Sequence, residues 1–149
     1  MADQNRIQLS DRFISEEAVA GASGIYPGHL VKLNSDAEAV VHDTEGGVAE
    51  RAFAVEDAFQ GNTVSDAYTE DEKLMYHIQQ RGGRVNALIQ AGQNLAVGDI
   101  LISAGDGTLI DEDEAGSGVS VADRIAVALE AIDLSASGAV ATLAKVRIL

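Results

Sequence analysis

The sequence contains no cysteine and no tryptophan, and it has one proline among 149 residues. Without cysteine the chain has no disulfide framework, no thiolate metal ligand and no cysteine nucleophile. It also lacks a run of 18 apolar residues, and no charged segment followed by an apolar one opens it. We therefore expect neither a membrane span nor a signal peptide.

Positive charge and aromatic side chains are scarce as well. Ten Lys and Arg residues stand against 24 Asp and Glu, a net charge of −14, and aromatic residues make up 4% of the chain. An acidic surface repels phosphate, so we expect no nucleic-acid partner. Leu, Ile, Val and Phe nevertheless total 40 residues, about 27%. That fraction supports a folded core built from small and branched side chains.

Short apolar runs separated by turn residues predict an all-β fold. Fifteen glycines punctuate the chain, and the runs between them are only four to ten residues long. Runs of this length and spacing are typical of a β-sandwich or small β-barrel. The runs are 28–33, 51–55, 85–89, 99–102, 124–129 and 140–149. Residues 16–149 are predicted to form one domain, preceded by an extended N-terminal arm over residues 1–15.

A hairpin is predicted around Gly82 and Gly83. A two-residue Gly-Gly loop suits a type I′ turn, in which both central residues have positive φ. With that loop Tyr76 lies opposite Ile89, and the same face of both strands is apolar. A shift of one residue would destroy this agreement, so the pattern favours this register.

A weak internal repeat also runs through the sequence. Residues 28–36 align with residues 98–106 at an offset of 70, and residues 51–59 resemble residues 124–132 at an offset of 73. The alternative is that turn-and-strand patterns resemble one another in any β-protein. Residues 124–132 are predicted as a strand because their apolar residues alternate, although Ser120-x-x-Asp123 resembles the capping box of a helix.

The sequence offers no recognisable catalytic or metal-binding pattern. The three histidines, His29, His42 and His77, have no metal-ligand spacing, and we expect them at the surface. The acidic run 111–116 does not complete a calcium loop, and Gly105-Asp106-Gly107 lacks the third glycine of a dinucleotide site. No nucleophile has an orienting partner that the sequence reveals. We therefore predict no enzyme activity, no metal and no cofactor.

Three segments resemble the head-decoration, or capsid cement, proteins of bacteriophages. They are the stretch 98–110 (GDILISAGDGTLI), the strand 124–131 (RIAVALEA) and the ending 146–149 (VRIL), with the G-x-x-V-x-L-like segment 20–33 also fitting. In that family a G-D-x-L/V strand leads to a D-G turn, and a G/A-V-A-L-E-A strand and a closing strand follow. Here Ala126 stands where a glycine is common. The resemblance covers about residues 16–149.

The resemblance implies a compact β-barrel-like, or β-tulip, domain with a flexible N-terminal arm. It also implies a homotrimer on the outer surface of the virion capsid, where it stabilises the head by binding the major capsid protein. Such a protein is made in the cytoplasm of the bacterial host, and the absence of cysteine agrees with that reducing compartment.

The N-terminal arm is the predicted capsid-binding site. It mixes basic and apolar residues ahead of an acidic body, and we expect it to be mobile in the free protein because it cannot bury its apolar residues alone. On a partner it would add a strand to an exposed sheet edge while its arginines pair with capsid carboxylates. The candidate residues are Arg6, Ile7, Leu9, Arg12, Phe13 and Ile14.

Two other functions remain open from the sequence. The first is a different virion or tail-associated β-module, such as a tail-tube or baseplate accessory, which would form hexameric rings rather than trimers. A small-molecule-binding β-barrel is the second alternative, and it would need a concave apolar pocket with converging polar groups.

Overall fold

The computed structural model describes residues 5–116 and 118–149, and residues 1–4 of the predicted arm lie outside this range. The regular secondary structure of the described residues is almost entirely β-strand, which confirms the all-β prediction. The strands are β1 (Phe13–Val19), β2 (Leu30–Leu33), β3 (Ala39–Val41), β4 (Ala52–Ala54), β5 (Lys73–Gln79), β6 (Arg84–Ile89), β7 (Asn94–Leu95), β8 (Ile100–Ser103), β9 (Leu109–Asp111), β10 (Ala126–Ala128), β11 (Ile132–Asp133) and β12 (Thr142–Ile148). Three short 3-10 helices lie in the connections: η1 (Ala58–Gln60), η2 (Glu112–Glu114) and η3 (Val121–Asp123).

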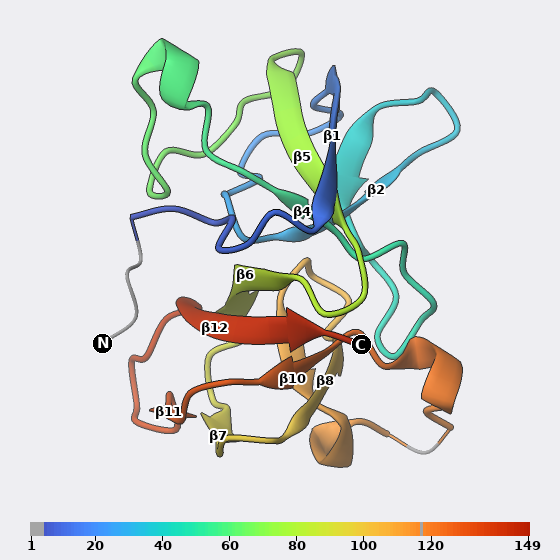
Figure 1. The fold of residues 1–149 in the computed structure, drawn as a ribbon, viewed down its shortest axis with the longest axis vertical. Helices are drawn as coiled ribbons and strands as arrows, with labels where there is room; N and C mark the ends of the chain where they lie inside the picture. The colour runs from blue at the N-terminus through green and yellow to red at the C-terminus, as the bar shows by residue number, and fades with distance from the viewer. Residues whose placement is uncertain (1–4, 117) are drawn as a thin grey trace.

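The strands form two five-stranded units, one above the other in Figure 1. The upper unit, here the N-terminal sheet, has the order β1-β5-β4-β2-β3. The lower unit, the C-terminal barrel, is closed in the order β10-β12-β6-β9-β8. A two-stranded ribbon of β7 and β11 lies at the bottom of the barrel.

The predicted hairpin across Gly82 and Gly83 is wrong. β5 pairs with β1 and β4, whereas β6 pairs with β12 and β9. The turn at residues 80–83, closed by the Gly83 N–H donating to the Gln80 carbonyl at 2.9 Å, carries the chain from one unit to the other. Tyr76 and Ile89 are both buried, as the alternation predicts, but they belong to separate cores.

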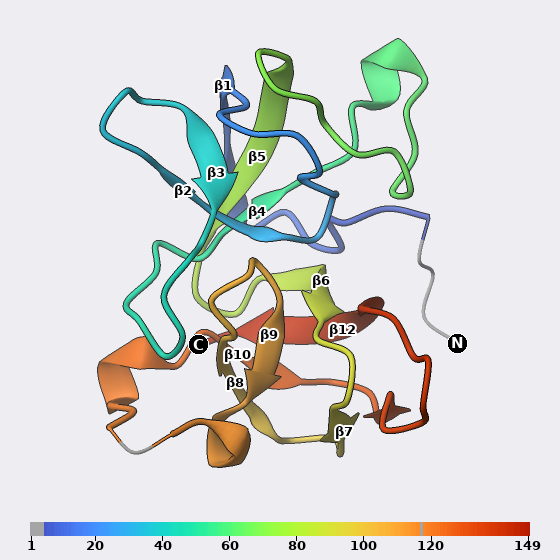
Figure 2. The same ribbon diagram turned by 180° about the vertical axis from the view of Figure 1, so that it is seen from behind.

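The internal repeat is confirmed by the strand pairing. Replacing β1, β5, β4, β2 and β3 by β6, β12, β10, β8 and β9 converts the order of the N-terminal sheet into that of the barrel. Val31 lies opposite Val41 in the β2–β3 hairpin, and Leu101 lies opposite Asp111 in the β8–β9 hairpin, an offset of 70 on both strands. Figure 2 shows these two hairpins in corresponding positions of the two units.

The two units also close in the same way. In the barrel, β6 and β9 meet in parallel at Ile89 and Leu109. In the N-terminal sheet, a single parallel bridge joins Ala20 to Ala39, the equivalent pair. The second half of the repeat needs one correction, because Val31 pairs with Ala52 while Leu101 pairs with Ala126, which makes the offset 74 rather than 73.

Residues 120–132 contain both a turn capped by Ser120 and Asp123 and a strand, the two features that the sequence offered as alternatives. The Asp123 carboxylate accepts a hydrogen bond from the Ser120 N–H at 2.7 Å, and this pair closes the single turn η3. The chain then extends into β10, whose three residues are all buried. A strand therefore follows a capped turn, and no longer helix forms there.

Two apolar cores hold the molecule together. One lies inside the N-terminal sheet and includes Leu74 and Tyr76. The larger one fills the barrel and extends upward to Leu30, Phe53 and Val55 of the N-terminal half. Phe53 is fully buried at this junction, so the two units share a core.

The N-terminal segment packs onto the barrel. Ile7 is fully buried in the larger core, which contradicts the expectation that the arm cannot bury its apolar residues. Gln8 forms an antiparallel bridge with Val85 on the outer edge of β6. Strand β1 starts at Phe13, inside the predicted arm, and the boundary at residue 15 stays a prediction.

The repeat provides a matched test of two glycines that initiate equivalent strands. Gly28 (φ +93°) and Gly98 (φ +100°) donate equivalent hydrogen bonds to the carbonyls of Ala54 and Ala128. An alanine at either position adopts a left-handed backbone, which costs about 1–2 kcal/mol. At Gly28 the added Cβ would also lie 2.5 Å from Leu143 Cδ2, whereas nothing lies within 4 Å at Gly98.

We therefore expect Gly28→Ala to destabilise the protein by about 1–3 kcal/mol more than Gly98→Ala, the usual range for overpacking. Urea unfolding followed by circular dichroism measures the difference. Equal effects of the two substitutions would show that Leu143 moves aside freely.

Candidate functional site

A buried serine–histidine pair lies beside the turn after β8. His42 Nδ1 lies 2.7 Å from the Ser103 hydroxyl, and its Nε2 lies 3.2 Å from the Val48 carbonyl. Because a carbonyl only accepts, Nε2 carries a proton and donates to Val48. Ser103 is fully buried and His42 is 4% exposed, which corrects the expected surface position of this histidine. No substrate can reach this hydroxyl, so the pair fixes the 43–48 loop to the barrel.

A polar network fixes the N-terminal segment between the two units. The Gln8 side chain accepts hydrogen bonds from Gln79 at 2.6 Å and from His77 Nδ1 at 3.0 Å. The imidazole of His77 in turn stacks on the ring of Phe13, with centroids 4.0 Å apart and planes inclined by 14°. Phe13 and His77 thereby connect β1 and β5 to the segment that covers β6.

The structure separates the six predicted capsid-binding residues. Ile7 is buried, and Leu9 and Phe13 are half-buried. Arg6, Arg12 and Ile14 are exposed, with Ile14 retaining 50% of its accessible surface. A partner can therefore touch part of this set from outside, but Ile7 belongs to the protein's own core.

A cluster of basic side chains, which we call the basic face, lies where the two units meet. Arg84 of β6 and Arg147 of β12 are directly opposite each other and both are exposed. Lys145 is two residues from Arg147 on the same outward side of β12. Like charges placed opposite each other across two strands are destabilising. This arrangement is therefore not explained by stability.

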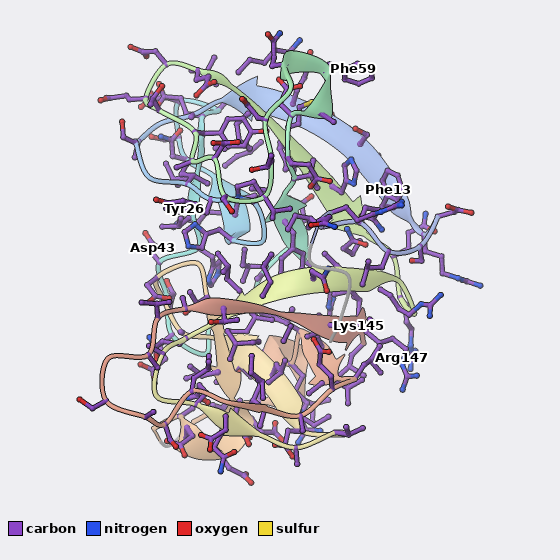
Figure 3. The ribbon with its side chains drawn as sticks, turned by 90° about the vertical axis from the view of Figure 1, so that its left-hand side faces the viewer. Phe13, Tyr26, Asp43, Phe59, Lys145 and Arg147 are labelled. Atoms are coloured by element: carbon purple, nitrogen blue, oxygen red, sulfur yellow. The ribbon has the colours of Figure 1, made fainter. Side chains whose placement is uncertain are left out.

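Arg12 and Arg81 extend the basic face along the turn that joins the units. The Arg12 carbonyl accepts a hydrogen bond from the Gln80 N–H, and the Ile148 carbonyl accepts one from the Gly82 N–H, which places this turn beside the end of β12. Beyond Arg81 lies a shallow groove of about 380 Å³, whose lining residues are Arg51, Arg81, Val121, Arg124 and Leu149. Figure 3 shows Phe13, Lys145 and Arg147 on one side of the molecule and Tyr26 and Asp43 on the other.

The basic face is not neutralised within residues 5–116 and 118–149. The ion pairs there join Lys32 to Asp43, Lys73 to Glu17 and Arg124 to Glu112, and none includes a residue of the basic face. Half of the ten basic residues of a chain with net charge −14 thus gather in one place without a carboxylate partner. Such a surface suits a partner that supplies carboxylates.

Sequence reasoning missed most of this cluster. Arg81 and Arg84 flank the Gly-Gly pair, and Lys145-x-Arg147 places two cations on one side of a strand. Their proximity depends on the pairing of β6 with β12, two strands that lie far apart in the sequence. The predicted hairpin assigned β6 to another neighbour and so hid the cluster.

The opposite side of the molecule carries an open groove of about 780 Å³ between the two units. Tyr26, His29, Leu88 and Leu143 are among its lining residues. His29 Nδ1 accepts the Tyr26 N–H at 3.0 Å, and the two rings meet edge to face. Tyr26 is the one Phe, Tyr or Trp among the lining residues of the groove, and its polar and apolar side chains are mixed, so its chemistry favours no particular ligand.

Two half-buried histidines predict a loss of stability below neutral pH. Burial lowers the pKa of His29, although the nearby Asp106 carboxylate partly opposes this, and burial also lowers the pKa of His77. Below about pH 6.5 the unfolded chain therefore binds more protons than the folded chain, so the free energy of unfolding decreases as the pH falls. Stability is fully present above that value and is lost as the pH falls through the lower folded pKa values.

We expect a lower melting temperature at pH 5.5 than at pH 7.5 and a smaller difference for the variant His29→Asn/His77→Asn. Thermal unfolding followed by circular dichroism checks this. An unchanged pH dependence in the variant would assign the effect to other groups.

The described residues contain no group of three His, Asp or Glu side chains close enough to hold a metal ion. In the same residues, no helix is long and apolar enough to cross a membrane.

Comparison with known proteins gives a fold but no family. No protein-family model and no curated protein matches this sequence. Solved structures do match, among them the crystal structure of the head fiber gp8.5 N base in bacteriophage phi29, with a TM-score of 0.56 and 15% sequence identity. The alignment covers 92% of this chain and 94% of that chain, so it spans both units. At this identity the likeness establishes a shared all-β fold.

Proposed function

We propose that this chain is a structural protein of a bacteriophage head that decorates the outer capsid surface as a homotrimer. By clamping neighbouring major capsid subunits it stabilises the head. The observation that carries the proposal is the likeness in fold, over nearly the full length of both chains, to a base domain of a phage head fiber. The resemblance of three sequence segments to decoration proteins supports the same class of function.

The chemistry of the surface agrees with a binding protein rather than an enzyme. The serine–histidine pair is sealed in the core, and the basic face presents arginine and lysine side chains on an otherwise acidic chain. Arginine forms two-point hydrogen bonds to carboxylates, which suits contact with an acidic protein surface. The exposed arm residues Arg6 and Ile14 extend the proposed contact region beyond the basic face.

Co-sedimentation with heads of the source phage that lack this protein tests the proposal. We expect saturable binding to heads, a higher temperature of DNA release for decorated heads, and a light-scattering mass three times the 15.5 kDa of one chain for the trimer. Failure to bind heads would contradict the proposal. Binding to tails instead, with a hexameric mass, would support the tail-associated alternative.

A further inference from the structure

Strand β1 has an open outer edge. The Gln80 N–H donates to the Arg12 carbonyl, and the Ala20 N–H donates to the Glu72 carbonyl. The backbone N–H and C=O groups of even-numbered residues in this stretch therefore point toward β5. The backbone groups of odd-numbered residues point away from β5, as shown by the Gly21 N–H, which donates to the Ala39 carbonyl. Among the described residues, no strand pairs with the outer edge along Phe13–Val19. The backbone groups of Ser15 and Glu17 therefore point to an unoccupied strand position.

The repeat shows what fills the equivalent edge. In the barrel, β6 takes the place of β1, and Arg84 and Asn86 correspond to Ser15 and Glu17 at an offset of 69. There the Leu9 N–H donates to the Arg84 carbonyl at 3.1 Å, and the Asn86 N–H donates to the Ile7 carbonyl at 2.9 Å. An extended segment with alternating apolar residues thus covers the edge of β6, while β1 lacks its counterpart.

The side chains along β1 agree with an unfilled position. Ile14 lies on the side of the sheet that carries the core residues Leu74 and Tyr76, yet it remains 50% exposed. Val19, at the other end of the strand, is 45% exposed. In the barrel, Ile7 of the covering segment is fully buried. A strand added to β1 would lie beside Ile14 on the core face of the sheet and beside Val19 on the other face.

We infer that the outer edge of β1 binds an extended strand of the capsid subunit, one that carries apolar residues alternating with at least one cation. The inference rests on the proposed function, and the cation complements the exposed Glu16, whereas Glu17 is paired with Lys73. A second copy of β1 fits poorly, because antiparallel self-pairing centred on Glu16, the middle residue of the strand, would place the two copies of Glu16 opposite each other. Main-chain hydrogen bonds supply the affinity in such strand addition, and alternate side chains supply the specificity.

Proline at position 17 tests the edge directly. The Glu17 N–H faces outward, so Glu17→Pro removes a donor for the added strand and leaves the hydrogen bonds to β5 in place. Glu17→Ala is the matched control, because it also loses the ion pair with Lys73 but keeps the N–H. We expect Glu17→Pro to bind heads at least tenfold more weakly than Glu17→Ala, with the two melting temperatures similar.

Equal binding by a folded Glu17→Pro protein would overturn the inference while the proposed function stands. Wild-type protein that does not bind heads overturns both. If Glu17→Pro fails to fold, hydrogen exchange on wild-type protein decides the question. The outward amides of Ser15 and Glu17 must gain protection when the protein binds heads, and unchanged exchange would overturn the inference.

Discussion

Ile7→Ala is expected to lower the free energy of unfolding by about 2–5 kcal/mol, the usual cost of removing a buried isoleucine side chain down to Cβ. Ile7 is fully buried in the core shared by the barrel and Phe53 of the N-terminal sheet. Domains are stable by about 5–15 kcal/mol, so the loss is a large fraction of the total. Urea unfolding followed by circular dichroism measures it.

Ile14→Ala provides the control for this prediction. Ile14 is half exposed, so its truncation is expected to cost much less than that of Ile7. If the two substitutions had the same small effect, residues 5–12 would behave as the mobile arm that the sequence suggests. A large effect at Ile7 means that deleting residues 2–14 removes part of the core. Such a deletion cannot separate capsid binding from folding, and surface substitutions are needed instead.

Many of the strands could be predicted from local pattern, because alternation and turn residues are local properties. β1, which starts inside the predicted arm, and the short strands β3 and β7 were not predicted. All six apolar runs contain a strand, and the buried position of Tyr76 follows from the alternation. The neighbours of each strand could not be predicted in the same way. β5 and β6 each have one face of buried apolar residues, and a hairpin satisfies that pattern as well as two separate cores do.

The repeat contained the information that the local pattern lacked. The sequence alignment of residues 28–36 with residues 98–106 corresponds to the equivalent hairpins β2–β3 and β8–β9. If each half forms one closed unit, β5 and β6 belong to different units and cannot pair. The Gly-Gly turn is then a connection between repeats. Only Gly82 of the pair has positive φ, which also departs from the type I′ turn of the predicted hairpin.

The candidate site was harder to predict than the fold, because it depends on pairing between distant strands. The sequence identified Arg12 as an exposed basic residue near the N-terminus, and the structure places it beside Arg81 and the end of β12. It did not reveal that Arg84 and Arg147 are opposite each other. Burial of Ile7 was likewise missed, since the core that receives it is assembled from both halves.

Arg147→Glu is expected to change stability and binding in opposite directions. In the free protein it replaces a like-charge pair with Arg84 by an opposite-charge pair, which should stabilise the fold by about 0.2–1 kcal/mol. On heads it places a carboxylate where the proposed partner supplies carboxylates, and we expect about 10- to 100-fold weaker binding, with the wild-type affinity falling as salt is added. The two effects are measured by thermal unfolding and by co-sedimentation.

Lys32→Glu is the matched control, because it lowers the net charge by the same two units away from the basic face. Lys32 is paired with Asp43, which lies on the other side of the molecule from Arg147 in Figure 3. We expect Lys32→Glu to leave head binding unchanged and not to raise the melting temperature. A substitution that strengthens the fold and weakens binding identifies a surface retained for its partner. If both variants weakened binding equally, net charge rather than the basic face would control the association, and if Arg147→Glu bound normally, the basic face would not touch the head.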